Sequence, residues 1–217
     1  MYRSLALASA IAIAVLLSAV AWSAPTGLVV IPTADVLDSD TACLDWFHEG
    51  PDVFHSDEMD SFLGFQASWD ERVEFGVDLW HEGSDGPWAN IKWQVVSEDE
   101  GKTPAIALGM QGIGDGCKPS YYAIASHQLA DNLRVHFGAT YADEVTLGMV
   151  GVEVPVNSIE GLTLCADWVS SGDGLASVGF DYGLGDFWSL MGGRIFYACE
   201  GADDTWYLDL CYTFNTK

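Results

Sequence analysis

The sequence predicts an all-β protein, and more narrowly a closed antiparallel up-and-down transmembrane β-barrel of about 12 strands. From residue 41 onward, short segments alternate apolar with polar or small residues, which is the period of a β-strand. The segments are even in number and several are joined by short turns, which favours a meander of neighbouring hairpins. The formal charge is −24 although 49% of the residues are hydrophobic. With 9 Trp, 8 Tyr and 10 Phe the chain is too aromatic to stay unfolded, so this charge belongs to a folded protein.

Residues 1–23 are typical of a secretory signal peptide. Arg3 supplies a positive charge, residues 5–20 are uncharged and apolar, and residues 21–23 offer a small-residue cleavage site. The apolar run of about 16 residues is shorter than the roughly 20 that a membrane-spanning helix needs, so a retained anchor is the weaker interpretation. We therefore expect export, with residues 24–40 forming a periplasmic segment or a plug of the lumen. Residues 41–217 are expected to form the barrel.

Twelve segments beyond residue 40 have the alternation expected of strands. In the clearest of them, Val73 and Phe75 lie on one face, and Glu74 and Asp78 lie on the other. We expect strands at residues 41–48, 61–69, 73–81, 88–97, 104–112, 119–128, 132–141, 145–154, 161–170, 174–183, 187–198 and 205–214. An even count places the first and last strands with their free ends on the same, periplasmic side.

The second face of each strand decides between a membrane barrel and a soluble β-sandwich, because both share the alternation. A soluble sandwich carries mixed Lys and Glu on its outer face. Here the second face is small or acidic with scarcely any Lys, and the remaining acids gather in turns and terminal segments. This distribution favours a barrel with lipid outside and a polar lumen inside. Aromatic residues near the segment ends are typical of interfacial girdles, and they are Trp69, Trp88, Tyr141, Trp168 and Trp206.

Charged residues within the strands are expected to point into the lumen. They are Asp45, Glu74, Asp78, Lys92, Arg134, Asp167, Asp181, Arg194 and Asp209, with Glu153 as a further acid. Counting from the turns places Arg194 opposite Asp209, and Lys92 opposite Asp78, so that opposite charges pair across strands. A structural role in a narrow lumen and a selectivity ring are the two interpretations of these pairs. An inward Arg194 requires a β-bulge at residues 192–193 to keep its apolar neighbours outside.

Two short stretches resemble known proteins. The last predicted strand, from Trp206 to Phe214, resembles the C-terminal signal by which bacterial outer-membrane barrels are recognised for assembly. Residues 27–34, Gly-Leu-Val-Val-Ile-Pro-Thr-Ala, look like the start of YjbH-like outer-membrane proteins associated with exopolysaccharide production. The second resemblance implies an outer-membrane barrel linked to polysaccharide export, with no catalytic residue to carry over.

The sequence contains no motif for a phosphate loop, a nucleophile elbow or a metalloprotease, and we expect no enzyme. Ser126 and His127 are sequence neighbours, so on a strand they face opposite sides and do not form a catalytic pair. A divalent cation is the one candidate cofactor, because imidazole and carboxylate ligands gather around the first hairpin. The candidate ligands are His48, Asp52, His55 and Asp57, and an exposed acidic loop is the other interpretation.

The five cysteines are an odd number, so at least one thiol is left over or pairs between chains. Cys43 and Cys211 lie on the first and last predicted strands, which become neighbours if the barrel closes. Both lie on the same face of their strands as the predicted inward acids Asp45 and Asp209. We therefore expect a disulfide or a close thiol pair between them.

These observations predict a narrow, cation-favouring pore or a structural barrel in the bacterial outer membrane, with a link to polysaccharide export implied by the resemblance. Its expected partners are outer-membrane lipid and the barrel-assembly machinery, and a pI near 4.1 argues against nucleic acid. The alternative is a secreted soluble β-sandwich that binds a glycan or a cation through its acidic loops.

Overall fold

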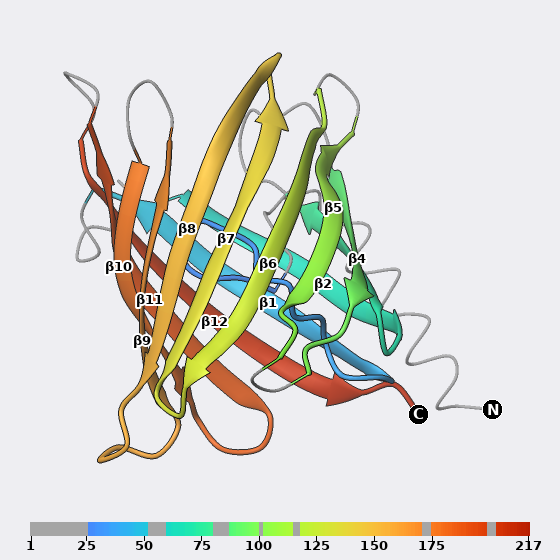
Figure 1. Ribbon diagram of the computed structural model, residues 1–217, viewed down its shortest axis with the longest axis vertical. Helices are drawn as coiled ribbons and strands as arrows, with labels where there is room; N and C mark the ends of the chain where they lie inside the picture. Colours follow the sequence, from blue (N-terminus) through green and yellow to red (C-terminus); the bar gives the residue numbers. More distant parts are fainter. Residues whose placement is uncertain are drawn as a thin grey trace.

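The computed structural model describes residues 26–51, 60–79, 87–99, 102–114, 118–170, 175–198 and 203–217. Twelve antiparallel strands form a closed barrel in which each strand pairs with its sequence neighbours and β12 pairs with β1 (Figure 1). The strands are β1 (Thr41–Gly50), β2 (Asp60–Asp70), β3 (Val73–Leu79), β4 (Trp88–Val96), β5 (Ala105–Ile113), β6 (Ser120–Ala130), β7 (Leu133–Ala142), β8 (Val145–Pro155), β9 (Leu162–Val169), β10 (Leu175–Gly183), β11 (Trp188–Tyr197) and β12 (Thr205–Asn215). The predicted closed barrel is confirmed, and the β-sandwich fold of the alternative is wrong.

Two tight turns show why the hairpins form where the sequence places them. Asp143 and Glu144 both have positive φ, at 47° and 69°, which is the backbone of the two-residue turn that matches the twist of a hairpin. Between β2 and β3, Asp70 Oδ1 accepts hydrogen bonds from the backbone N–H groups of Arg72 and Val73. Such local bonds fix the register of the strands on either side.

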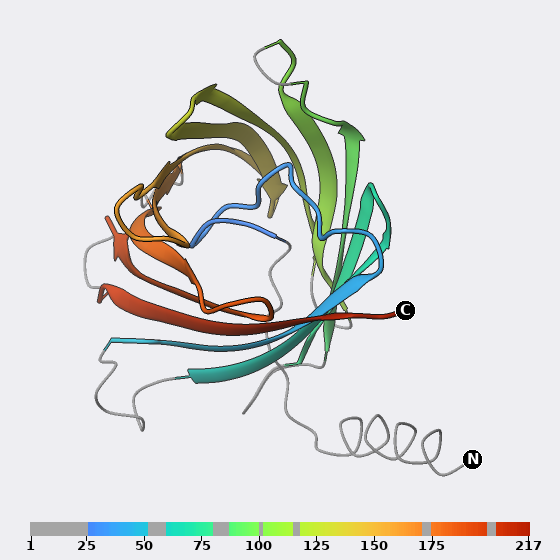
Figure 2. The same cartoon turned by 90° about the horizontal axis from the view of Figure 1, so that it is seen from below.

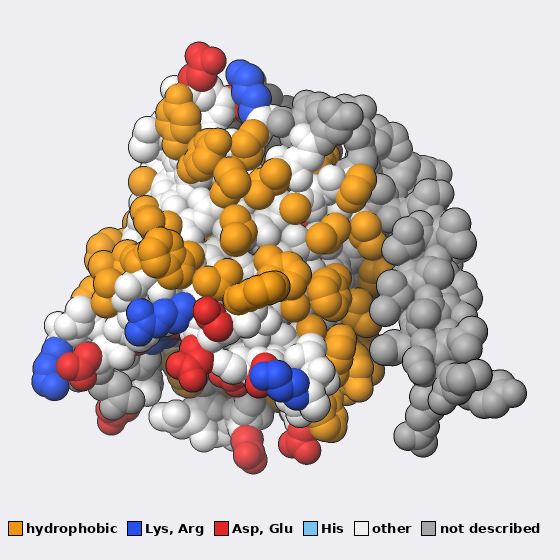
Figure 3. All heavy atoms as spheres, turned by 90° about the vertical axis from the view of Figure 1, so that its right-hand side faces the viewer, with side chains coloured by type: hydrophobic (Ala, Val, Ile, Leu, Met, Phe, Trp, Pro, Cys, Tyr) orange, Lys and Arg blue, Asp and Glu red, His pale blue; other side chains and the backbone are white. Residues whose placement is uncertain are grey.

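The outer face of the barrel is apolar. Large hydrophobic side chains are exposed on it, and Figure 3 shows them over the middle of the wall, with charged side chains toward the ends. The exposed aromatic residues include Trp46, Trp69, Trp93, Tyr121, Phe137, Tyr141, Trp168, Phe187, Trp188, Phe196 and Trp206. A wall of this kind suits hydrocarbon and its interfaces rather than water. Among the described residues no helix has the length and apolar character to cross a membrane.

Trp88 does not belong to this outer set, although the sequence placed it in a girdle. It pairs with Asp78 across β3 and β4, and cross-strand partners share a face of the sheet. Its side chain is half-buried. Trp88 has the same parity as Asn90 and Lys92, which are buried on the inner face, so alternation alone places it inside, and its position at the end of the segment was the misleading signal.

Residues 26–40, which we call the inner segment, run through the inside of the barrel. Figure 2 shows this stretch in blue, crossing the ring of strands before it continues into β1. A bridge between Gly27 and Pro32, with a hydrogen bond from Leu28 N to Ile31 O of 2.9 Å, folds its first part into a small hairpin. Leu28 and Ile31 are buried in one core with inward residues of the wall.

Candidate functional site: the barrel lumen

The inner face carries eight of the nine charged residues that the sequence assigned to the lumen. They are Asp45, Glu74, Asp78, Lys92, Arg134, Asp167, Asp181 and Asp209, and Glu153 lies on the same face. Glu74 and Lys92 have no exposed surface, while Asp45, Asp78 and Asp167 are 8%, 4% and 5% exposed. Their outward neighbours on the same strands are the exposed apolar residues described above.

Arg194 is the ninth residue, and its predicted position was wrong. It pairs with Val178 on β10 and with Trp206 on β12, both of which are exposed on the outer face. Its guanidinium lies 5.2 Å from the ring centre of Trp206 and donates a hydrogen bond of 3.1 Å to Asp204. The register of β11 is continuous through residues 192–193, so the bulge that an inward arginine required is absent. A position near the end of β11 lets the long side chain reach polar groups while its stem packs on aromatic rings.

The two predicted charge pairs are shifted in register. Asp209 lies opposite Met191, and Lys92 lies opposite Glu74 rather than Asp78. Lys92 Nζ is 3.4 Å from Glu74 Oε1, and both side chains are fully buried. Counting from an assumed turn centre placed the pairs wrongly, because a hairpin loop of uncertain length moves every pairing beyond it.

Glu74 joins the inner segment to the wall. Its carboxylate accepts hydrogen bonds from Thr26 N at 2.8 Å, Thr26 Oγ1 at 2.5 Å and Leu37 N at 2.9 Å. A fourth bond of 2.8 Å comes from Gln66 Nε2 on β2. Lys92 donates to Thr26 O at 2.9 Å, so both members of the buried ion pair hold the same residue of the segment.

Asp167 and a set of small residues hold the hairpin of the inner segment from β9 and its neighbours. Its Oδ2 accepts a hydrogen bond of 3.0 Å from Val30 N, and its Oδ1 accepts one of 2.7 Å from Ser177. A Cβ added at Gly151 would lie 2.5 Å from Leu28 Cδ1. The absence of a side chain at this wall position makes room for the apolar tip of the hairpin.

Ser126, His136 and Glu153 form a chain of polar contacts that the sequence did not reveal. Ser126 Oγ lies 2.8 Å from His136 Nδ1, and Glu153 Oε2 lies 3.3 Å from His136 Nε2. The order of the groups is that of a nucleophile, a base and an acid. Ser126 and His136 have no exposed surface, however, and Ser126 Oγ also accepts a hydrogen bond of 2.8 Å from Ala34 N of the inner segment. The chain of contacts therefore holds the segment rather than a substrate.

A second charged cluster fixes the middle of the inner segment near the β4–β5 connection. Arg134 donates to Asp35 Oδ1 at 2.7 Å and also to Glu98 Oε2. Burial raises the pKa of Glu98. Hydrogen bonds from Gln128 N and Arg134, together with the positive charge of Arg134, lower it by more, so the pKa of Glu98 lies below its usual value. His127 Nδ1 is a further neighbour, 3.0 Å from Glu98 Oε1.

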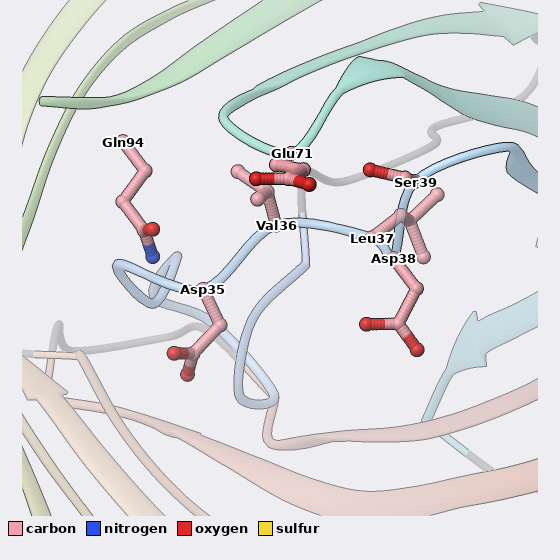
Figure 4. Close-up of a pocket in the computed structure, with 7 residues that line it drawn as sticks. All are labelled: Asp35, Val36, Leu37, Asp38, Ser39, Glu71 and Gln94. Carbon is pink, nitrogen blue, oxygen red and sulfur yellow. The ribbon is translucent and has the colours of Figure 1, made fainter. Parts of the chain in front are cut away.

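An open pocket of about 400 Å³ lies beside the second half of the inner segment. It is lined by Asp35, Val36, Leu37, Asp38, Ser39, Glu71 and Gln94. Figure 4 shows the carboxylates of Asp35, Asp38 and Glu71 around it. Gln94 Nε2 donates to Ala34 O at 2.8 Å, so this side of the pocket is tied to the segment. The charged lining of the pocket is entirely acidic.

The inner face of β1, β10 and β12 is also acidic. Asp45, Asp181 and Asp209 face inward there, and no ion pair joins any of them to a Lys or Arg of the described ranges. Lys92 and Arg134 lie on β4 and β7 and contact the inner segment instead. The described basic residues of the lumen are therefore engaged by the segment and its acidic neighbours, whereas these three inward acids are not paired with any of them.

Most of the predicted metal ligands of the first hairpin lie outside the described residues, namely Asp52, His55 and Asp57. His48 is described, and its Nδ1 lies 2.8 Å from Ser61 Oγ. Its ring packs edge-on against Trp46 with 4.4 Å between centroids. Both contacts are with neighbours of the barrel wall.

Cys43 and Cys211 lie close together as free thiols, across the seam where β1 meets β12. The predicted close thiol pair is therefore present, without the disulfide. Cys165 is a further free thiol, buried at an inward position of β9. The other two cysteines, at positions 117 and 199, lie outside the described residues, as does the predicted signal peptide.

The comparisons with known proteins bear on the fold. No protein-family model matches the sequence, and no curated protein matches it. Among solved structures, KdgM porin is similar with a TM-score of 0.61 and 13% sequence identity, over 80% of this chain and 99% of that one. A KdgM porin in complex with disordered oligogalacturonate is similar with a TM-score of 0.59 and 12% identity, over the same shares of the two chains. At such identities the likeness establishes the fold, a closed β-barrel of the kind that these porins have. The resemblance of residues 27–34 to YjbH-like proteins stays a prediction.

Proposed function

We propose that the protein is a narrow outer-membrane pore that favours cations and that its inner segment acts as a plug. The observation that carries the proposal is the separation of charge within the lumen. Lys92 and Arg134, the basic side chains of the described inner face, are bonded to the segment or to its neighbours. Within the described ranges Asp45, Asp181 and Asp209 have no such partner, and a lumen of this kind attracts cations and repels anions.

The acidic pocket beside the inner segment supports the same selectivity. It lies next to Asp38, whose backbone oxygen is bonded to Thr41 at the start of β1, and so near the end of the barrel where β1 begins. Carboxylates at a mouth raise the local concentration of cations before they enter the lumen. Acidic side chains thus lie both around this pocket and on the inner face of the wall.

Oligogalacturonate, which is bound by one similar porin, does not suit this lumen. It is a chain of sugar carboxylates, and like charges repel in a confined, poorly solvated space. A link with polysaccharide export would rest on the resemblance of residues 27–34 to YjbH-like proteins. Leu28, Val29 and Ile31 of this stretch are buried in the lumen core, where they pack against the wall instead of facing a sugar chain. We therefore assign the pore to small cations.

The test is the reversal potential of the purified barrel in planar bilayers under a salt gradient, with a chelator present to remove divalent ions. The wild type should prefer cations, and Asp181→Asn combined with Asp209→Asn should weaken that preference. Asp131→Asn, at an exposed turn between β6 and β7, removes a charge of the same sign away from the lumen and is the matched control. Anion preference in the wild type would refute the selectivity. Absence of conductance even after deletion of residues 26–37 would identify a structural barrel instead.

The partners we propose are outer-membrane lipid around the apolar wall and the assembly machinery at β12. The outward side of β12 ends with Tyr212 and Phe214, whose rings stack at 5.9 Å. Phe214→Ala should lower the amount of barrel assembled in cells, measured by heat-modifiable mobility, while Thr216→Ala should not. Equal assembly of the two variants would argue against recognition through this strand.

A further inference from the structure

We propose that Cys43, Asp45 and Cys211 form a binding site for a thiophilic divalent cation, such as Zn²⁺, at the seam between β1 and β12. The two sulfur atoms and a carboxylate oxygen of Asp45 all lie within 4.8 Å of one another. Zinc binds sulfur at about 2.3 Å and carboxylate oxygen at about 2.0–2.2 Å, so neighbouring ligands of a tetrahedral ion are about 3.4–3.8 Å apart. Small shifts of the three side chains would therefore bring their ligand atoms to these separations.

The strand register explains why the trio converges. Asp45 pairs directly with Cys211, and Cys43 lies two residues before Asp45 on the same face of β1. Cys43 Sγ lies 3.2 Å and 3.3 Å from the two carboxylate oxygens of Asp45, and in the metal-free state the thiol donates to them. Two rigid, paired strands thus hold the ligands in place before any ion arrives, which lowers the entropic cost of binding.

Asp209 provides a second, independent observation. It lies two residues before Cys211 on the inward face of β12, and its Oδ1 is buried without a hydrogen-bond partner among the described residues. A buried carboxylate oxygen without a donor is costly, and a nearby cation would offset that cost. A water molecule would complete a four-ligand site around the ion, with the negative charge of Asp209 two residues along the strand.

The chemistry of the donors selects the cation. Thiolates bind Zn²⁺ and its soft neighbours far better than Ca²⁺ or Mg²⁺, which prefer all-oxygen sites. On binding, each thiol forms a sulfur–metal bond and releases its proton to solvent, so one ion displaces two protons and no oxidant or reductant is needed. Cys43 and Asp45 are buried and Cys211 is partly exposed, so the ion approaches from the side of Cys211.

A bound ion would connect the first strand of the barrel to the last. Ligands at residues 43 and 45 belong to β1, whereas the ligand at residue 211 belongs to β12, so the ion spans the closure of the sheet. The site is independent of the proposed pore, because it needs neither conductance nor the inner segment. Its failure and the failure of the proposed function are therefore separate results.

The test uses the full barrel, purified folded in detergent, reduced with a phosphine, stripped with a chelator and desalted. Zinc is then titrated in competition with a chromophoric chelator, and Co²⁺ is used as a spectroscopic probe for sulfur-to-metal charge transfer. The wild type should bind one Zn²⁺ per chain, give the charge-transfer band with Co²⁺, and release two protons per ion. Cys43→Ser and Cys211→Ser should lose the band and bind at least tenfold more weakly.

Cys165→Ser is the matched control, because Cys165 is also a buried inward thiol but lies on β9, away from the seam. It should bind as the wild type does. The temperature at which the folded band disappears from gels should rise with Zn²⁺ in the wild type and in this control, but not in Cys211→Ser.

A second measurement needs no variant, in case a substitution prevents folding. Zinc should protect Cys43 and Cys211 of the wild type from alkylation while leaving the modification of Cys165 unchanged, as read by mass spectrometry. Binding that survives Cys43→Ser and Cys211→Ser, equal alkylation with and without zinc, or no uptake by the fully reduced wild type would each overturn the proposal. A Cys43–Cys211 disulfide in protein taken from cells, together with no uptake after reduction, would do the same.

Discussion

Exchanging Glu74 for glutamine should loosen the inner segment, because the amide has the shape of the carboxylate but only one acceptor oxygen. The carboxylate now accepts four hydrogen bonds, two on each oxygen. Whichever way the amide is turned, two of the four donors face an NH₂ group in place of an oxygen. Lys92 also loses its counter-charge at a position with no exposed surface.

The magnitude follows from the burial of the pair. Removing one member of a buried ion pair typically costs about 3–5 kcal/mol, because the remaining charge is left uncompensated. We expect Glu74→Gln to lower the free energy of unfolding by that amount and Lys92→Met to lower it by a similar amount. The double variant should cost less than the sum of the two, with a coupling of about 1–3 kcal/mol, because it leaves no isolated charge.

The assay is denaturant unfolding of the detergent-solubilised barrel, followed by its tryptophan fluorescence, together with single-channel conductance. Conductance should rise in Glu74→Gln, because Thr26 and Leu37 lose their shared anchor. Asp131→Asn serves as the control with the same chemical change at an exposed turn. If the two single effects add within about 0.5 kcal/mol and conductance stays at the wild-type value, the ion pair does not hold the segment.

Three further outcomes are expected. Folding lowers the pKa of Glu98, so the stabilisation that this carboxylate provides is complete above its usual pKa of 4.5 and is lost as the pH falls below that value. Acidification toward about pH 3 should therefore destabilise the wild type more than Glu98→Gln. Parallel curves of stability against pH for the two proteins would contradict this. Gly151→Ala brings a methyl group within 2.5 Å of Leu28 and should cost about 1–3 kcal/mol, with recovery in combination with Leu28→Ala. Gly148→Ala, whose nearest atom would lie 3.3 Å away, should cost less, and equal losses would show that the inner segment does not fill this space. Ser126→Ala removes a buried acceptor of the inner segment and should lower stability by about 1–3 kcal/mol in thermal unfolding, whereas an unchanged unfolding temperature would show that the hydroxyl contributes nothing.

The strands could be predicted from the sequence because their alternation is local. Each predicted strand begins and ends within two residues of the observed one, and the closed order β1 to β12 follows from short connections between neighbours. The inward position of Glu74, Asp78 and Lys92 could also be predicted, because the alternation of faces along one strand does not depend on which strand it pairs with. Membrane-facing and lumen-facing residues thus separate on sequence grounds wherever a strand is regular.

Register and irregular backbone were beyond the same reasoning. Lys92 was assigned to Asp78 rather than Glu74 because pairing depends on the length of a loop, which alternation does not fix. Trp88 was assigned from its position at the end of a segment, whereas its parity with Lys92 places it on the inner face. Arg194 was placed inside because charge usually avoids lipid, whereas here Asp204 and aromatic rings satisfy it near the end of the strand.

The contacts of the lumen were also hidden, because they join residues far apart in the chain. Thr26 reaches Glu74 across 48 positions, and Val30 reaches Asp167 across 137. The serine that the sequence compared with His127 is bonded to His136 on the next strand instead. Irregular segments carry no period, so the path of the inner segment could be described only from the folded chain.

The position of the inner segment has a consequence for how the protein forms. Residues 26–40 precede all twelve strands, and their hydrogen bonds reach β3, β6 and β9, which are spread around the wall. A sheet that curls around this segment gains contacts before its first and last strands meet. These contacts offset, strand by strand, the loss of chain entropy that closing the barrel requires. The inner segment in this way acts as an internal template, and it guides the curvature of the sheet that finally encloses it.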